Sequence, residues 1–279
     1  MGKLYVVSTP IGNLGDITKR AVECLSFVDV ILCEDTRVSM KLLNSLGIKG
    51  KLVSYHKFNE VSMASKIVSD ILDGKDMALI SDAGTPCISD PGYVLVKEAK
   101  ERGVSVIPIG GMCAFVSALS VSGLDSLRFS FCSFFPRDSK ERDVLISDIK
   151  SSFIKTYAFY ESPKRIVKTL YYLYDNLGNI KISVSRELTK VFETNYYGFI
   201  LDVIKQIESD DKSSLGEYTF VFEKGEYESN SDDISLCAYI VDVMVKDGVS
   251  VKEAISVLVS RGFNRNKLYD ASLKLKDLF

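Results

Sequence analysis

Acidic side chains follow two apolar stretches in the first hundred residues, where strands of a sheet should end. Glu34 and Asp35 follow one stretch, and Asp82 and Asp90 follow the other. A carboxylate beside a bound substrate can accept a proton from a hydroxyl group. The chain has a single histidine, His56, so a Ser-His-Asp triad would depend on that residue and a histidine-rich metal site cannot form. Carboxylates are therefore the first candidates for acid–base chemistry.

Four polar segments follow predicted strands in the first half of the chain. They read TPIGNLGD at 9–16, CEDTR at 33–37, SDAGTPCISDPG at 81–92 and IGGMCA at 109–114. In an open α/β sheet, ligands bind outside the carboxyl ends of the strands. Proline fixes the φ angle, so the segments that contain it are stiff. One such segment could be an ordinary rigid turn, but four together favour a ligand site.

The same segments limit the class of ligand. No Gly-x-x-x-x-Gly-Lys-Ser/Thr motif occurs, and the spacing of Gly12 and Gly15 does not fit a dinucleotide fingerprint. The segments carry few cations, which disfavours a di- or triphosphate. Small residues, backbone amides and isolated acids suit an uncharged or zwitterionic ligand, such as a nucleoside with an amino-acid tail.

Composition fits a soluble globular protein with one large or two medium domains. The 279 residues are 46% hydrophobic and 26% charged, and the net charge of −2 lacks the basic footprint of most nucleic-acid binders. The six cysteines include no Cys-x-x-Cys pair, so we expect no metal site and buried thiols in a reducing compartment. No apolar run suits a membrane span or a signal peptide, and we expect a cytoplasmic protein without a membrane partner.

Strand and helix patterns alternate over the first 110 residues and position the four segments. The predicted strands lie at 3–8, 28–34, 78–81 and 105–109. The predicted helices lie at 17–27, 60–74, 93–102 and 113–121. Continuous apolar strands in such a pattern predict an α/β fold with a mainly parallel sheet that is covered on both faces.

Two further units follow, and we expect domains at 1–123, 124–226 and 227–279. The second is also α/β, with strands at 129–135, 156–161, 181–187 and 218–223 and helices at 142–151, 163–176 and 199–209. The third begins with a polar linker at 227–233 and has helical spacing at 251–259 and from about 264, with Gly262 between. This pattern resembles a helix-turn-helix. It fits a small packing domain or an RNA-contacting one.

Five segments together resemble a known family. Residues 4–21, 33–37, 78–92, 160–166 and 185–193 are similar to the small-subunit ribosomal RNA methyltransferase I family, and the similarity extends into the C-terminal helices. That family has the tetrapyrrole methylase fold, with two α/β domains and an S-adenosylmethionine cleft between them. The resemblance implies methylation of the ribose 2′-hydroxyl of a cytidine in the decoding region of 16S rRNA, within the small ribosomal subunit. It also implies a homodimer.

The resemblance assigns a cofactor role to residues from three loops of the first domain and one strand of the second. They are Pro10, Ile11, Gly12, Asp82, Ala83, Gly84, Thr85, Ile88, Cys113, Ala114 and Tyr160.

A proton acceptor should assist the ribose hydroxyl, which is a weak nucleophile. We favour Glu34 and Asp35, which end a strand that faces the cleft. Further candidates are Asp82, Asp90, Glu161 and Glu187. Each of these acids could instead cap a turn or form an ion pair, and Asp35 could simply pair with Arg37.

RNA binding needs cations and surfaces for bases. The cations on or near the motifs are Arg37, Lys57, Arg137, Lys140, Arg142, Lys164, Arg165, Arg186 and Lys190. Tyr55, Phe134 and Phe135 could stack on an unpaired base, although core packing is the more ordinary role for such residues.

The chain departs from the family pattern at informative positions. The family's Pro-Gly-Pro-Ser-Ala is Gly-Gly-Met-Cys-Ala at 110–114, and Lys164 replaces a histidine. A histidine there is thus dispensable as a base. Two other functions stay open, which are methylation of a tetrapyrrole on the same fold and a non-catalytic role in ribosome assembly.

Overall fold

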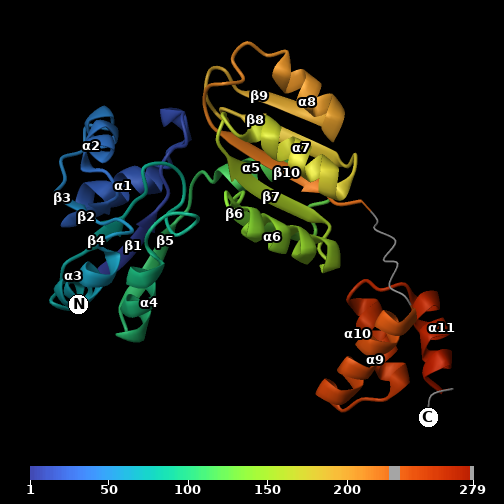
Figure 1. The fold of residues 1–279 in the computed structure, drawn as a ribbon. Helices are drawn as coiled ribbons and strands as arrows, with labels where there is room; N and C mark the ends of the chain where they lie inside the picture. The colour runs from blue at the N-terminus through green and yellow to red at the C-terminus, as the bar shows by residue number, and fades with distance from the viewer. Residues whose placement is uncertain (226–232, 277–279) are drawn as a thin grey trace.

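The computed structural model describes residues 1–225 and 233–276, which form two α/β units and a helical unit in chain order (Figure 1). Apart from Asp233, the predicted linker at 227–233 lies outside the described residues.

The first sheet is entirely parallel, as the sequence predicted. Its strand order is β3-β2-β4-β1-β5. The strands are β1 (Lys3–Val7), β2 (Val30–Cys33), β3 (Leu52–Ser54), β4 (Met77–Leu79) and β5 (Ser105–Ile109). The short β3 was not predicted, because its three residues are all half-buried and are too few to show the hydrophobic pattern of a strand. Since all five strands run the same way, the loops at their carboxyl ends meet at one edge.

Helices cover both faces of this sheet. They are α1 (Lys19–Phe27), α2 (Thr36–Ser45), α3 (Glu60–Leu72) and α4 (Tyr93–Glu101), with a 3-10 turn at Leu14–Asp16. Neighbouring strand residues point to opposite faces: Leu4 packs with α3 and α4, and Tyr5 packs with α1 and α2. The sequence missed α2, whose polar first turn coincides with the CEDTR motif.

The second sheet has the order β6-β7-β10-β8-β9 and is mixed. Only β6 and β7 pair in parallel, and the other pairs are antiparallel. Its strands are β6 (Phe129–Phe134), β7 (Thr156–Glu161), β8 (Lys181–Arg186), β9 (Thr194–Phe199) and β10 (Tyr218–Glu223). One face packs against α6 (Ser139–Ser151), α7 (Ile166–Leu177) and α8 (Ile200–Glu208) around Phe159, Phe220 and Phe222. The sequence analysis did not predict β9.

The opposite face of the second sheet carries α5 (Ala114–Val121) (Figure 1). Ala118 and Leu119 of this helix share a cluster with Ala158 and Val221 of the sheet. The domain boundary at residue 123 stays a prediction. In the structure, α5 already packs against the second sheet, although it lies before that boundary. The segment before α5 therefore connects the two sheets.

The helical unit contains α9 (Asp233–Asp247), α10 (Val251–Ser260) and α11 (Arg265–Lys276). Ser250 and Glu253 form a capping box at the start of α10, and Gly262 turns the chain with φ +99°. The ring of Phe263 lies 4.6 Å from that of Phe153, beyond the end of α6. No helix among the described residues is long and apolar enough to cross a membrane.

Candidate functional site

Hydrogen bonds join the loops that follow β1, β4 and β5. The backbones of Thr9 and Gly84 pair in both directions, with N–H···O distances of 2.8 and 3.1 Å. The Thr85 hydroxyl donates to the Met112 carbonyl at 3.0 Å and lies 2.9 Å from the hydroxyl of Ser8. The Asp35 N–H also donates to Oδ1 of Asp82 at 3.1 Å, so all four motif segments form one hydrogen-bonded assembly at the carboxyl edge of the first sheet.

The loop at 81–92 holds an unusual backbone. Gly84, Cys87, Ser89 and Gly92 all have φ angles between +66° and +137°. Left-handed geometry is costly for the two residues that are not glycine, and such strain concentrates at functional sites. Gly84 suits glycine because of its φ angle of +84°, whereas a Cβ there would make only an ordinary contact, 3.4 Å from the side chain of Ile11.

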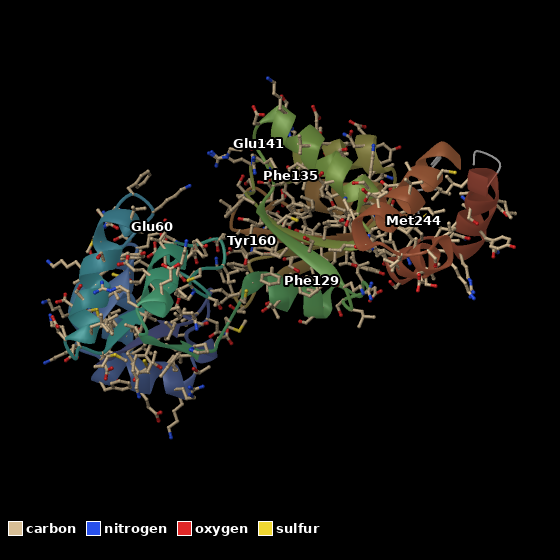
Figure 2. The ribbon with its side chains drawn as sticks, turned by 90° about the horizontal axis from the view of Figure 1, so that it is seen from below. Glu60, Phe129, Phe135, Glu141, Tyr160 and Met244 are labelled. Carbon is tan, nitrogen blue, oxygen red and sulfur yellow. The ribbon has the colours of Figure 1, made fainter. Side chains whose placement is uncertain are left out.

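A cavity of about 490 Å³ lies between this loop assembly and the second sheet. This volume is typical of sites for small molecules and cofactors. Its lining residues are Ile11, Asp82, Ala83, Gly84, Thr85, Ile88, Ser89, Asp90, Cys113, Ala114, Phe134, Tyr160, Glu161, Ser162, Pro163, Gly216, Glu217, Tyr218 and Thr219. Figure 2 shows Tyr160 where the second α/β unit faces the first.

All the predicted cofactor residues except Pro10 and Gly12 line this cavity. Gly12 instead makes room for the second unit, because a Cβ there would lie 2.3 Å from Cγ of Lys190. The wall at 216–219 was not predicted, because this segment has no motif. Its one local signal is Gly216, which has φ +88° just before β10.

The cavity is lined by acids and lacks cations. Among its described lining residues there is no Lys, Arg or His. Glu161 is buried and pairs with Arg165 at 2.6 Å, and Glu217 pairs with Lys190 at 3.0 Å. A negative lining attracts a cationic or zwitterionic ligand and repels a polyphosphate.

Asp90 has the most perturbed carboxyl in this lining. Burial raises the pKa of Asp90 to about 6, and the charges of Glu34 and Asp82 add to the rise. Burial also raises the pKa of Tyr160 well above its usual range, and its phenol shares a hydrogen bond with the Cys113 thiol. Tyr160 therefore stays protonated at neutral pH.

The two favoured acids, Glu34 and Asp35, lie outside the cavity lining. Asp35 caps α2 by accepting the Arg37 N–H at 2.8 Å, and it pairs with the Arg37 guanidinium at 2.6 Å. These hydrogen bonds lower the pKa of Asp35 to about 2, which makes it a weak proton acceptor. In this structure Asp35 caps a helix, and its role as a base stays a prediction. Burial raises the pKa of Glu34.

Three of the predicted RNA-binding cations are engaged within the second unit. Arg186 is 3% exposed and pairs with Asp210 at 3.0 Å, so its predicted RNA contact is corrected to a structural role. Arg165 pairs with Glu161 and donates to the Phe135 carbonyl at 2.8 Å.

Lys190 bridges two carboxylates at the edge of the second sheet. It lies 2.7 Å from Glu187, whose carboxylate also accepts the Glu217 N–H at 3.1 Å. Glu187 is outside the cavity lining, so this candidate acid has a structural partner instead.

The remaining predicted cations lie at the surface. Lys57, Arg137, Lys140 and Lys164 are exposed and belong to no ion pair among the described residues. Arg37 is exposed but pairs with Asp35. Arg142 is half-buried, with its guanidinium 4.8 Å from the ring centre of Tyr172.

The aromatic candidates divide by burial. Tyr55 and Phe135 are core residues, and a stacking role for them is corrected because their exposed fractions are 1% and 2%. Phe134 is exposed and lines the cavity. A further aromatic side chain, Phe58, lies at the surface and was not among the predicted contacts. It is 95% exposed on a turn held by Asn59, whose Oδ1 accepts the His56 N–H at 2.7 Å.

No group of three or more His, Cys, Asp or Glu side chains within 1–225 and 233–276 could hold a metal ion.

Solved structures share this fold at low sequence identity. A diphthine synthase aligns with a TM-score of 0.61 and 13% identity, covering 79% of this chain and 90% of its own. Uroporphyrin-III-C-methyltransferase from Thermus thermophilus aligns with a TM-score of 0.53 and 16% identity, and the alignment covers 80% of this chain and 94% of its own. These likenesses concern the fold alone.

Sequence relatives are much closer. A protein of Vibrio cholerae named ribosomal RNA small subunit methyltransferase I is 48% identical over 77% of this chain and 74% of its own. A protein of the same name from Haemophilus influenzae is 39% identical over 98% of this chain and 96% of its own. The family profile "Tetrapyrrole (Corrin/Porphyrin) Methylases" matches residues 3–200. The chain therefore belongs to the tetrapyrrole methylase family, a family of S-adenosylmethionine-dependent methyltransferases.

Proposed function

We propose that this protein methylates the ribose 2′-hydroxyl of a cytidine in the decoding region of 16S rRNA. The observation that carries the proposal is the acid-lined, cation-free cavity between the two sheets of a methylase fold. The names of the sequence relatives support ribosomal RNA of the small subunit as the substrate class. Such a substrate places the enzyme in the cytoplasm, where ribosomes assemble.

The cavity suits S-adenosylmethionine in size and charge. At neutral pH this cofactor carries a sulfonium, an ammonium and one carboxylate, so its net charge is positive. Asp82 and Asp90 supply negative charge, and Ile11, Ile88 and Ala114 supply apolar walls. When bound, the cofactor provides a methyl group on a positively charged sulfur.

The chain's own contribution is mainly placement. The Thr9–Gly84 and Thr85–Met112 hydrogen bonds fix the first wall of the cavity. Tyr160 and the segment at 216–219 form the opposite wall. Such preorganised walls hold the reacting groups in line and exclude water, which is the main requirement of a methyl transfer.

RNA would approach across surfaces on both sides of the cavity. Lys57 and Phe58 belong to the turn after β3, at the same sheet edge as the cavity loops. Arg137, Lys140 and Lys164 are exposed on the second unit. Cations of this kind position the phosphate backbone, and Phe58 and Phe134 offer faces for unpaired bases.

We also propose that the protein works as a homodimer, as the family resemblance implies. Val116 and Val121 on α5 and Leu127 before β6 are apolar and more than half exposed, which suits burial against a second copy. Light scattering coupled to gel filtration checks this, and a monomeric mass would contradict it.

A labelled-methyl assay tests the function. Small subunits isolated without the modification should accept label, and nuclease digestion should release a 2′-O-methylated cytidine dinucleotide. Uroporphyrinogen III serves as the competing substrate, because the family description and one structural neighbour concern tetrapyrroles. Label on the tetrapyrrole and none on RNA would overturn the proposal. Cofactor binding without transfer to either substrate would instead favour the role in ribosome assembly.

A further inference from the structure

Asp90 is held in the cavity wall from both sides along the chain. The hydroxyl of Ser89, before it, lies 2.8 Å from that of Ser133 on β6. The backbone N–H of Gly92, two residues after it, donates to Oε2 of Glu60 on α3 at 3.3 Å. The strained loop is thus anchored to two other elements on either side of Asp90.

Asp90 differs from the other cavity acids in its partners. Asp82 accepts the backbone N–H of Asp35 at 3.1 Å. Arg165 neutralises Glu161, and Lys190 neutralises Glu217. No ion pair within the described part of the chain includes Asp90. Its polar partner is the hydroxyl of Ser81, which also donates to backbone carbonyls of the same loop. Asp90 can therefore take up a proton without breaking a salt bridge.

The charges around Asp90 are negative or neutral. Glu34 at the end of β2 and Asp82 after β4 both disfavour its ionised form. The thiols of Cys87 and Cys113 and the phenol of Tyr160 also lie within its electrostatic reach. A carboxyl in this setting has a higher proton affinity than an ordinary aspartate, which suits a base that works near neutral pH.

We propose that Asp90 is the general base of the reaction, an inference that rests on the proposed function. As the ribose 2′-oxygen forms its bond to the methyl carbon, the bond from that carbon to sulfur breaks and its electron pair stays on sulfur. The hydroxyl proton passes to a carboxylate oxygen of Asp90 and later to water. The carboxylate thus ends the cycle as it began.

The geometry favours Asp90 over the two acids that the sequence favoured. Glu34 and Asp35 lie outside the cavity lining, whereas Asp90 is part of it. Asp35 is also held ionised by Arg37. In this proposal Glu34 acts on Asp90 only through its charge, as a positioning residue for the proton.

The first test compares Asp90→Asn with the wild type. We expect single-turnover methyl transfer to fall about 100- to 10,000-fold, the usual contribution of a general base. Affinity for S-adenosylmethionine, measured by calorimetry, should fall far less, by no more than about tenfold, because the variant removes one of the two negative charges that Asp82 and Asp90 supply. Asp70→Asn, which changes a half-buried acid on α3 that pairs with Lys75 outside the cavity, is the matched control and should transfer at the wild-type rate. An Asp90→Asn enzyme that keeps its rate would overturn the assignment.

The second test uses pH and has a readout besides activity. The wild-type rate should fall below pH ~6 as Asp90 becomes protonated, and Glu34→Gln should move this limb to lower pH. Carboxyl-carbon NMR of aspartate-labelled protein without cofactor should show a titration near pH 6 that Asp90→Asn removes. The proposal would be overturned if Glu34→Gln left the acid limb of the pH–rate profile in place. It would also be overturned if no aspartate carboxyl resonance titrated near pH 6. Wild-type protein that transfers no methyl group to RNA would overturn the proposed function itself.

Discussion

The hydroxyl oxygens of Ser89 and Ser133 lie 2.8 Å apart, so a hydrogen bond joins the loop after β4 to the second sheet. Both residues have left-handed backbones, with φ angles of 66° and 61°. Ser133 also lies where the pairing of β6 with β7 shifts register. Two strained residues thus meet across the opening between the two α/β units.

We predict that this hydrogen bond supports cofactor binding. Ser89→Ala and Ser133→Ala should each weaken the affinity for S-adenosylmethionine by about 2- to 10-fold, as loss of one hydrogen bond of about 0.5–1.5 kcal/mol would. The double variant should bind no more weakly than either single variant, because both changes remove the same contact. Calorimetry of the four proteins checks this. Fully additive losses would show that the two hydroxyls act separately.

A second prediction concerns stability and the Asp90 carboxyl. Its pKa is about 6 in the folded protein and about 3.9 in an unfolded chain. Folding therefore favours the protonated form, so the carboxyl destabilises the fold increasingly as pH rises from about 4 to 6, and constantly above that. We compare the free energy of unfolding of Asp90→Asn with that of the wild type. The difference, variant minus wild type, should be about 1–2 kcal/mol larger at pH 8 than at pH 4, a figure that allows for screening by solvent.

Thermal melts of both proteins between pH 4 and 8 measure this difference, which corresponds to roughly 2–6 °C in a chain of this size. A constant gap between the two melting curves would mean that Asp90 titrates as an ordinary surface acid.

A third prediction separates structural cations from RNA-binding ones. Arg186 is buried, pairs with Asp210 and donates to the Lys212 carbonyl. Arg186→Met should destabilise the protein by about 3 kcal/mol, because it leaves polar partners without a donor. Lys164→Met, at an exposed position, should change stability by less than about 0.5 kcal/mol. Urea unfolding compares the two. Equal free energies of unfolding in the two variants would show that the Arg186 ion pair is not structural, and the predicted RNA contact of Arg186 would then stand.

A fourth prediction concerns the path of RNA. Replacing Arg137, Lys140 and Lys164 with Ala should weaken binding to small subunits and reduce the slope of log affinity against log salt by about 1 for each lost phosphate contact. The control triple variant changes Lys3, Lys51 and Lys100, exposed residues at the opposite edge of the first sheet. Equal losses in the two triple variants would show that binding depends on total charge only.

Phe58→Ala distinguishes stacking from charge in the same assay. Stacking of a base on an aromatic ring contributes about 1–3 kcal/mol, so affinity should fall roughly tenfold or more. The salt slope should not change, because no cation is lost.

The sequence predicted the layout of the first sheet because its strands are continuous apolar runs between proline- and glycine-rich loops. Most of the cavity lining followed from those loops. The segment at 216–219 did not, since only the pairing of β10 with β7 and β8 brings it opposite Gly84. The ion pair of Arg186 with Asp210 is likewise a contact between distant segments. Neither has a local pattern to reveal it.

The preference among acids differs from the assignment proposed above for a related reason. Glu34 and Asp35 end a strand at the expected edge, and position in sequence could not tell a cap from a base. Asp35 begins α2 and meets Arg37 two residues later, whereas Asp90 reaches the cavity through a loop whose course depends on Ser133 and Glu60. Burial, which decides the proton affinity of a carboxyl, comes only with the fold.

The most direct test of the account is a calorimetric titration of S-adenosylmethionine into the wild type and Thr85→Arg. Thr85 lines the cavity and lies beside Ser8 and Met112, so an arginine there would fill the space and add a positive charge. The wild type should bind one cofactor per chain, and the variant should bind none while keeping the circular-dichroism spectrum of the wild type. Normal affinity in a folded Thr85→Arg protein would show that this cavity is not the cofactor site.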